Sequence, residues 1–163
     1  MTRNLKNLSA HSLSNRSHWL LLMLLICQSC THKKYAHYVN YIDHKRNYTK
    51  VGMINLLNNI DDYNGKYVEV EGKFEFYFEK SSLSPTYFDF FRKHRRALWI
   101  NLSEKNPLYL PGTNESLTES IRNIEGLNDK KIIIHGKVNT SNHGHLSNYA
   151  AEIDSITSVI VEK

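Results

Sequence analysis

The chain has 163 residues, of which 21 are Lys or Arg and 16 are Asp or Glu, so its formal charge is +5. Its 18 aromatic residues and its total of only ten Gly and Pro exclude a disordered or collagen-like chain. Two Cys are too few for a disulfide scaffold or a four-thiolate zinc site.

The first thirty residues have the order of a secretory signal peptide. Residues 1–18 contain three basic residues and no acidic one, and residues 19–26 form an unbroken apolar run. This run is shorter than the roughly 20 residues that span a bilayer. It also lacks the polar face that a buried amphipathic helix shows at helical period. A basic head, a short apolar core and a small residue before a break predict export.

The end of this segment resembles the lipobox of bacterial lipoprotein signal peptides. In that family a small residue precedes a Cys that is diacylated on sulfur and becomes the mature N-terminus, and Ser29 and Cys30 match these positions. Cys27 and Gln28 depart from the usual pattern, and Cys27 is the competing lipid site, although Ile26 before it is bulky. The resemblance implies a bilayer anchor at Cys30 and a place in the bacterial cell envelope. The residue after Cys30 is not Asp, which favours the outer membrane in a bacterium that has one.

The positive charge lies outside the part that is expected to fold. Residues 1–29 carry a net +3 and residues 30–50 a net +4, whereas residues 51–163 carry 13 basic and 15 acidic residues, a net −2. We therefore predict a signal peptide over 1–29, a lipid anchor and flexible basic tether over 30–50, and one domain over 51–163. The alternatives to lipidation are a plain cleaved signal peptide and an uncleaved anchor.

Apolar spacing predicts the first elements of this domain. Residues 51–60 have the spacing of a short helix, and the turn residues of 61–65 end it. Alternation over 68–78, with Val68, Val70, Phe74, Phe76 and Phe78 on one face, predicts a strand. A Ser-Pro pair predicts a helix over 85–95, and a second strand is predicted over 97–103.

The second half is predicted to contain one helix and three strands. Two prolines place a loop over 106–114, and Ser116 with Glu119 resembles a capping box for a short helix. A third strand follows over 132–138. After a turn, two further strands over 146–153 and 156–161 complete the domain.

Residues 63–74 and 127–138 form an internal repeat. Asn, Lys, Gly and Lys recur at matched places, with branched apolar residues between them. Each copy is a turn that leads into a strand, and Gly72 or Gly136 within that strand indicates a bulge or bend. Two bent strands, about five strands in all and a helix between them predict a mainly β domain with short helices, folded as a small, partly open barrel.

Short motifs mark the turns and strands of this predicted barrel. They are Tyr63-Asn64-Gly65-Lys66, Val68-Glu69-Val70-Glu71-Gly72, Leu98-Trp99-Ile100, Ile134-His135-Gly136 and Gly144-His145-Leu146. On these motifs the stretch from about residue 54 to residue 156 resembles small bacterial OB-fold-like domains of unknown function. The resemblance implies an OB-like five-stranded barrel and assigns no activity or residue role.

His143 and His145 are the candidate metal ligands. On an extended chain the two imidazoles would face the same side, as a metal pair needs, and His135 and Glu152 are the ligands that the sheet would add. Two ligands at useful spacing do not make a site. We therefore predict no metal and no other cofactor, and a glycine turn flanked by polar residues is the simpler interpretation.

Arg92, Arg95, Arg96 and Trp99 form the candidate ligand surface. OB-folds bind single strands by stacking bases on aromatic rings beside basic groups, and residues 87–96 mix both types. The net acidic charge of the domain and its predicted export argue against nucleic acid. An amphipathic helix with a cationic last turn, which suits the helix dipole, explains the same residues.

The sequence contains no motif for catalysis. A Gly-x-Ser-x-Gly elbow, a His-Glu-x-x-His motif and a phosphate loop are all absent, and no Cys follows Cys30. We therefore predict a membrane-anchored envelope lipoprotein that acts as a binding module for a protein or glycan, and not an enzyme. An oligonucleotide-binding OB module is the alternative. A metal-dependent or other enzyme built round His143 and His145 is the third.

Overall fold

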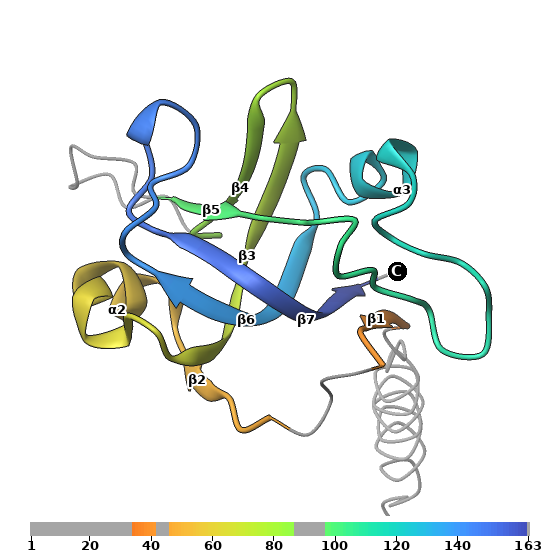
Figure 1. Cartoon of the computed structure of the whole chain (residues 1–163), viewed down its shortest axis with the longest axis horizontal. Helices are drawn as coiled ribbons and strands as arrows, with labels where there is room; N and C mark the ends of the chain where they lie inside the picture. The colour runs from red at the N-terminus through yellow and green to blue at the C-terminus, as the bar shows by residue number, and fades with distance from the viewer. Residues whose placement is uncertain (1–33, 42–45, 87–96, 163) are drawn as a thin grey trace, which may run out of the picture. The chain divides into compact units, whose positions relative to one another are not determined.

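The computed structural model describes residues 34–41, 46–86 and 97–162 (Figure 1). The predicted lipid site Cys30, its competitor Cys27 and all but the first two residues of the helix predicted over 85–95 lie outside these residues. Among the residues that are described, no helix is long and apolar enough to cross a membrane.

The described part of the chain is mainly β. Its strands are β1 (Tyr35–Val39), β2 (Thr49–Val51), β3 (Tyr67–Tyr77), β4 (Lys80–Ser84), β5 (Leu98–Ile100), β6 (Lys131–Asn139) and β7 (Glu152–Glu162). Its helices are α2 (Met53–Asn58) and α3 (Ile121–Glu125), with single 3-10 turns η1 (Ile60–Tyr63) and η2 (His145–Ser147).

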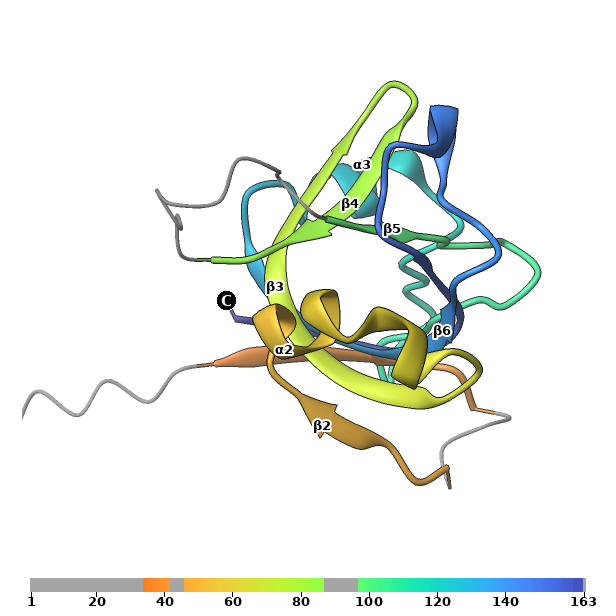
Figure 2. The ribbon, with the colours of Figure 1, turned by 90° about the vertical axis from the view of Figure 1, so that its left-hand side faces the viewer.

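Five of these strands close into a barrel. The order β3–β4–β5–β7–β6 returns to β3, and each neighbouring pair is hydrogen-bonded. All of the pairs are antiparallel except β5 with β7, which is parallel. The predicted OB-like barrel is therefore confirmed, but it is closed rather than partly open, because β6 pairs with both β3 and β7. Figure 2 shows the strands surrounding the interior.

The barrel interior is filled by alternate residues of its strands. The other face of each strand carries more polar side chains, as expected for period-2 alternation. Apolar residues of α2 join the same core. The largest of its fully buried side chains are Phe74, Leu56, Leu83, Leu98, Ile100, Leu108, Leu117, Ile132, Ile134, Ile153, Val68 and Val70.

The internal repeat folds back on itself. β3 and β6 pair antiparallel with Val70 opposite Ile134, and each of these is the eighth residue of its copy. Val68 lies opposite Gly136, and the equivalent pair places Gly72 opposite Ile132. The two copies are therefore related by a local two-fold axis that passes between Val70 and Ile134.

The turn of each copy binds the end of the other copy's strand. The Gly65 N–H donates to the Val138 carbonyl at 2.8 Å, and the Asp129 N–H donates to the Phe74 carbonyl at 2.9 Å. These two bonds are equivalent under the local two-fold. Gly65 has φ +75° and Asp129 has φ +60°, so both turns use the left-handed backbone region that such tight turns require.

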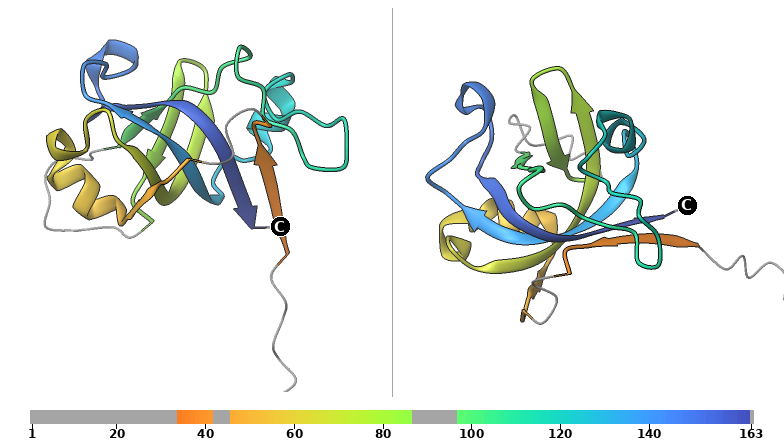
Figure 3. Two further views of the ribbon diagram at one scale, coloured as in Figure 1. Left: turned by 60° about the horizontal axis from the view of Figure 1, so that its bottom comes forward. Right: turned by 45° about the vertical axis from the view of Figure 1, so that its right-hand side comes forward.

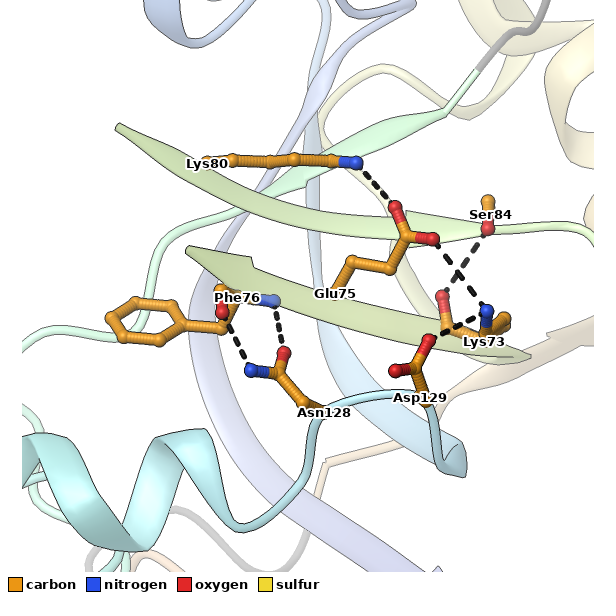
Figure 4. A network of polar contacts seen from close by, with 7 residues as sticks. All are labelled: Lys73, Glu75, Phe76, Lys80, Ser84, Asn128 and Asp129. Carbon is orange, nitrogen blue, oxygen red and sulfur yellow. Dashed lines mark hydrogen bonds and ion pairs between the residues drawn. The ribbon is translucent and has the colours of Figure 1, made fainter. Parts of the chain in front are cut away.

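The asparagines before Gly65 and Asp129 add side-chain hydrogen bonds to the same contact between the two copies. The Asn64 side-chain oxygen accepts from the Thr140 N–H at 3.1 Å. At the equivalent place the Asn128 side chain accepts from the Phe76 N–H and donates to the Phe76 carbonyl (Figure 4). Two matched sets of bonds thus fix the register of β3 against β6 at both ends.

Gly72 and Gly136 allow the next strand to cross close over the repeat. A Cβ on Gly72 would lie 2.7 Å from the Leu83 Cγ, and one on Gly136 would lie 2.5 Å from the Ile153 Cγ2. The register of β6 with β7 shifts at Gly136, as the predicted bulge requires. The ladder between β3 and β6 ends at Lys73, and the pairing of β4 with the other edge of β3 begins at the same residue, directly after Gly72.

The predicted flexible tether over 30–50 is wrong for residues 35–39, which form β1, and for residues 49–50, which begin β2. β1 pairs antiparallel with the C-terminal part of β7, and β2 pairs parallel with β3. Ala36 and Tyr38 alternate with exposed residues and are buried against the barrel. The compact unit accordingly begins at residue 34, before the predicted boundary at 51.

Two predictions for the C-terminal half are also wrong. α3 has Ser120 as its N-cap, because Ser116 is buried and Leu117 packs into the core. The strand predicted over 146–153 begins only at Glu152. β7 then continues as one strand to Glu162, so the two predicted strands are one. It bends at Ser155, where φ is +47°.

Replacing either crossing glycine with alanine should destabilise the barrel. Because the added Cβ meets a neighbouring strand, Gly72→Ala and Gly136→Ala should each lower the free energy of unfolding by about 2–3 kcal/mol. Gly52→Ala is the control, since its Cβ meets nothing within 4 Å and its φ of −71° suits alanine. It should change stability by less than about 1 kcal/mol. Urea unfolding of the three variants measures this, and equal small effects would contradict the crossing.

Candidate functional site

Two loops present apolar side chains at one end of the barrel. Phe78, in the turn between β3 and β4, is 91% exposed, and Leu146, in η2, is 76% exposed. Tyr77 beside Phe78 is also exposed. We call the surface formed by Tyr77, Phe78, Glu79, His145 and Leu146 the loop-tip surface. Figures 1 and 3 show the two loops projecting at the same end of the barrel.

The two loops contact each other through a polar pair. The His145 Nε2 lies 3.3 Å from the Glu79 Oε2. Glu79 (φ +57°) and Leu146 (φ +54°) both have left-handed backbone conformations, which are uncommon for residues other than glycine. The sharp turns at these residues expose Phe78 and Leu146 while the polar pair joins the loops.

Aromatic residues form the base of the η2 loop. Trp99 points out of the barrel, because Leu98 and Ile100 on either side of it are buried in the core. The Tyr149 ring packs edge-on against Trp99 at 5.1 Å. A Cβ on Gly144 would lie 2.6 Å from the indole, so the loop backbone rests directly on Trp99.

The candidate ligands His143 and His145 do not form a pair. Gly144 has φ +64°, so the chain turns between His143 and His145 instead of running extended. The His143 Nδ1 lies 3.1 Å from the Tyr149 carbonyl oxygen, whereas His145 contacts Glu79. Within the described residues no group of three or more His, Cys, Asp or Glu side chains is placed to hold a metal ion.

The two ligands expected to join that pair lie elsewhere. His135 contacts Glu69 on the outer face of β3 and β6 at 3.0 Å. Glu152 is buried and accepts a hydrogen bond from the Asn101 amide at 2.6 Å. Each of these groups thus has a partner of its own.

Of the candidate ligand surface, only Trp99 lies within the described residues. Arg92, Arg95 and Arg96 lie outside the described residues. The sequence did not single out Phe78 or Leu146 as surface residues, because each was assigned to a strand. Phe78 continues the apolar alternation of β3, but the strand ends at Tyr77 and leaves Phe78 in the turn. The charged residues 79 and 80 that follow Phe78 were the signal in the sequence that the strand ends there.

A second group of polar residues crosses four strands on the outside of the barrel. Lys50, Glu69, His135 and Ser158 occupy directly paired positions of β2, β3, β6 and β7, and we call them the polar row. The Lys50 Nζ lies 2.7 Å from the Glu69 Oε1. The hydrogen bond from Lys50 lowers the pKa of Glu69, burial opposes this, and the bond with His135 lowers the pKa further.

The polar row joins β1 to the barrel. The His37 Nε2 of β1 lies 2.8 Å from the Ser158 Oγ, and the Tyr48 ring stacks on His135 at 4.5 Å. Ser158 is buried and bonded to His37, while Glu69 is bonded to the other imidazole. This is not the serine–histidine–carboxylate chain of a hydrolase, in which one histidine bridges both groups.

Gly144→Ala should disturb the base of the η2 loop, and Gly112→Ala is its matched control. Both glycines have positive φ (+64° and +79°), so both substitutions carry a backbone cost of about 1–3 kcal/mol. Only the Cβ at position 144 meets Trp99. In a Trp19→Phe background, Trp99 emission should shift in Gly144→Ala and not in Gly112→Ala. Identical spectra would contradict the packing of the loop on Trp99.

The contact of β1 with β7 should weaken in acid. Burial and the charge of His135 lower the pKa of His37 from its ordinary value of 6.5. The folded state therefore takes up this proton less readily than the unfolded state. The stabilisation is present above about pH 6.5 and is lost as the pH falls through the lower folded pKa.

Hydrogen exchange measures this effect. Below pH 6.5 the amides of β1 should lose protection, after correction for intrinsic rates, while those at the centre of β3 and β6 keep it. His37→Gln removes the titrating group and should abolish the pH dependence. The same loss of protection in His37→Gln would assign the effect to another group, of which Glu69, His135 and Lys50 are nearest along the polar row.

Comparison with known proteins identifies no relative of this chain. No protein-family model, curated protein or solved structure matches it. The interpretation of the loop-tip surface and of the polar row therefore depends on their own geometry.

Proposed function

We propose that the chain is an exported lipoprotein, anchored through Cys30, whose barrel binds a protein or glycan partner at the loop-tip surface. The observation that carries this proposal is the exposure of Phe78 and Leu146 on two loops that contact each other. Large apolar side chains that gather at one exposed place are typical of interaction sites. Aromatic residues in particular supply much of the binding energy of interfaces.

The place of this surface in the fold supports the proposal. OB-folds bind oligonucleotides and oligosaccharides with the loop between their first two strands, the loop between their last two, and the face of strands two and three. In this barrel those parts are the β3–β4 turn, residues 140–151, and the strands β4 and β5. Phe78, Leu146 and Trp99 lie in these parts.

The charge of the surface favours a protein or glycan over a nucleic acid. Single-stranded nucleic acid needs a cationic groove beside aromatic rings. Here Lys80, next to the turn, forms an ion pair with Glu75, and His145 contacts Glu79 (Figure 4 shows the Lys80–Glu75 pair). The surface thus offers apolar and aromatic groups with balanced charge. An oligonucleotide-binding module is the second candidate, and it depends on Arg92, Arg95 and Arg96 beside Trp99.

Cys30→Ser should abolish lipid attachment. In bacteria that express the full chain, a palmitate analogue should label the wild type and Cys27→Ser but not Cys30→Ser, because diacylation requires the Cys30 sulfur. The labelled band in a gel measures this. Equal labelling of Cys30→Ser would end the proposed anchor, and loss in Cys27→Ser alone would move it to Cys27.

A photo-crosslinking amino acid at position 78 should capture the partner. In cells it should give a discrete adduct, because a bound partner covers the loop-tip surface. The same amino acid at Ile54, an exposed apolar residue of α2, is the matched control and should give none. Leu146→Ser should remove the adduct at position 78 without a change in unfolding midpoint, since Leu146 is exposed. Equal adducts at both positions would contradict the site.

The same protein distinguishes the second candidate. A gel shift with single-stranded DNA that weakens with salt and is lost when Arg92, Arg95 and Arg96 are neutralised would favour the oligonucleotide module. An array of envelope glycans distinguishes a glycan partner from a protein partner. If the partner is a glycan, the wild type should bind the array and Leu146→Ser should not.

A further inference from the structure

The outer face of β1 carries aromatic side chains. Along this strand and the residues that follow it, Ala36, Tyr38 and Asn40 are buried against the barrel. The alternate residues face outward, and Tyr35 and Tyr41 among them are 55% and 51% exposed. Alternation of this kind gives one strand an inner face that packs and an outer face that is open to a partner.

β1 is a fixed part of the barrel. All five of its residues pair in register with β7, beginning with Tyr35 opposite Glu162. The Tyr38 hydroxyl donates to Glu115 at 3.1 Å. Val39 and Tyr109 exchange two backbone hydrogen bonds of 2.9 Å. The outer face of β1 therefore has a fixed orientation relative to the rest of the barrel.

Little chain separates β1 from the proposed lipid site. Four residues, 31–34, lie between Cys30 and Tyr35. At about 3.3–3.6 Å per residue, the Tyr35 Cα is at most about 18 Å from the Cys30 Cα. A lipid on Cys30 would thus hold the start of β1 within about 18 Å of the lipid attachment point.

The chemistry of this face suits a membrane surface. The Tyr41 ring stacks on Tyr109 with centroids 5.8 Å apart, so together with Tyr35 three tyrosines lie on the outer face of β1 and its continuation. Tyrosine has an apolar ring and a polar tip, and it is enriched where lipid meets water. Lys34 directly precedes the strand, and a basic residue near anionic headgroups is attracted to them.

Two nearby carboxylates accept hydrogen bonds from tyrosine hydroxyls of this region, and a third, Glu162, lies opposite Tyr35. Glu115 accepts from the Tyr38 hydroxyl, and Glu119 accepts from the Tyr109 hydroxyl at 3.3 Å. Burial raises the pKa of Tyr38, and the bond to Glu115 raises it further. Loss of solvent contact and the charge of Glu119 raise the pKa of Tyr109. The face thus presents three tyrosines and the imidazole of His37 beside a basic residue.

We infer that the outer face of β1, with Tyr35, Tyr41 and Tyr109, is the surface that the barrel turns toward the lipid bilayer. This inference rests on the proposed anchor at Cys30. If the β1 face turns toward the bilayer, the orientation of the loop-tip surface relative to the membrane follows. Figures 1, 2 and 3 show the β3–β4 turn and η2 far from the start of β1 and from the C-terminal end of β7. The loop-tip surface then faces away from the membrane, toward a partner outside that bilayer.

The mature lipidated chain allows a direct test. Acylation occupies the Cys30 sulfur and cleavage removes Cys27, so the mature chain has no free thiol and accepts a single introduced one. Tyr41→Cys and Tyr35→Cys place a fluorophore on the β1 face, Phe78→Cys places it on the loop-tip surface, and Ile54→Cys is the control. Each lipidated protein is inserted into vesicles of phosphatidylethanolamine and phosphatidylglycerol that contain a lipid with a nitroxide on its headgroup.

Fluorophores at positions 35 and 41 should be quenched, and those at positions 78 and 54 should keep their emission. Equal quenching at positions 41 and 78, or no quenching at any position in protein that floats with the vesicles, would overturn the orientation. Protein that neither incorporates palmitate nor floats would overturn the anchor itself, and the inference with it. A dimer in detergent that shields the label at position 41 would assign the β1 face to a second copy of the chain and would also overturn the inference.

Discussion

The antiparallel pairing of β3 with β6 is the contact on which the rest of the barrel depends. It is centred on Val70 and Ile134, equivalent residues of the internal repeat, and the turn of each copy hydrogen-bonds to the end of the other copy's strand. Because each strand has a glycine where its neighbour crosses, β4 can leave β3 at Gly72 and β7 can cross β6 at Gly136. β5 then joins β4 to β7 and closes the ring.

The two surfaces that matter for function follow from this closure. Residues 140–151 must return from the end of β6 to the start of β7, and in doing so they cross Trp99 of β5 and reach Glu79. That path exposes Leu146 beside Phe78. On another side of the barrel, the edge of β7 beyond β5 accepts β1, and Ser158 of the polar row shares a hydrogen bond with His37. One surface is thus built from loops and the other from an added strand.

The positive charge of the chain does not mark a basic binding surface on the described barrel. It lies mostly in the signal segment and in residues 30–50, while the domain from residue 51 is slightly acidic. Part of the basic stretch is not a tether, since β1 and the start of β2 belong to the folded unit. On the outer face of the barrel, Lys50, Lys73 and Lys80 are each paired with carboxylates, as Figure 4 shows for Lys73 and Lys80. Charge therefore gives the barrel little attraction for a polyanion.

The sequence by itself determined the β class, the repeat and the outward place of Trp99, because alternation and glycine positions report local geometry. Only the tertiary structure decided closure, β1, β4 and the exposure of Phe78 and Leu146. β4 is rich in serine and is a strand because β3 and β5 pair with it on both sides. Whether an apolar residue is buried or exposed depends on where its strand ends and what crosses it. Contacts between distant segments set both, and a local pattern does not record them.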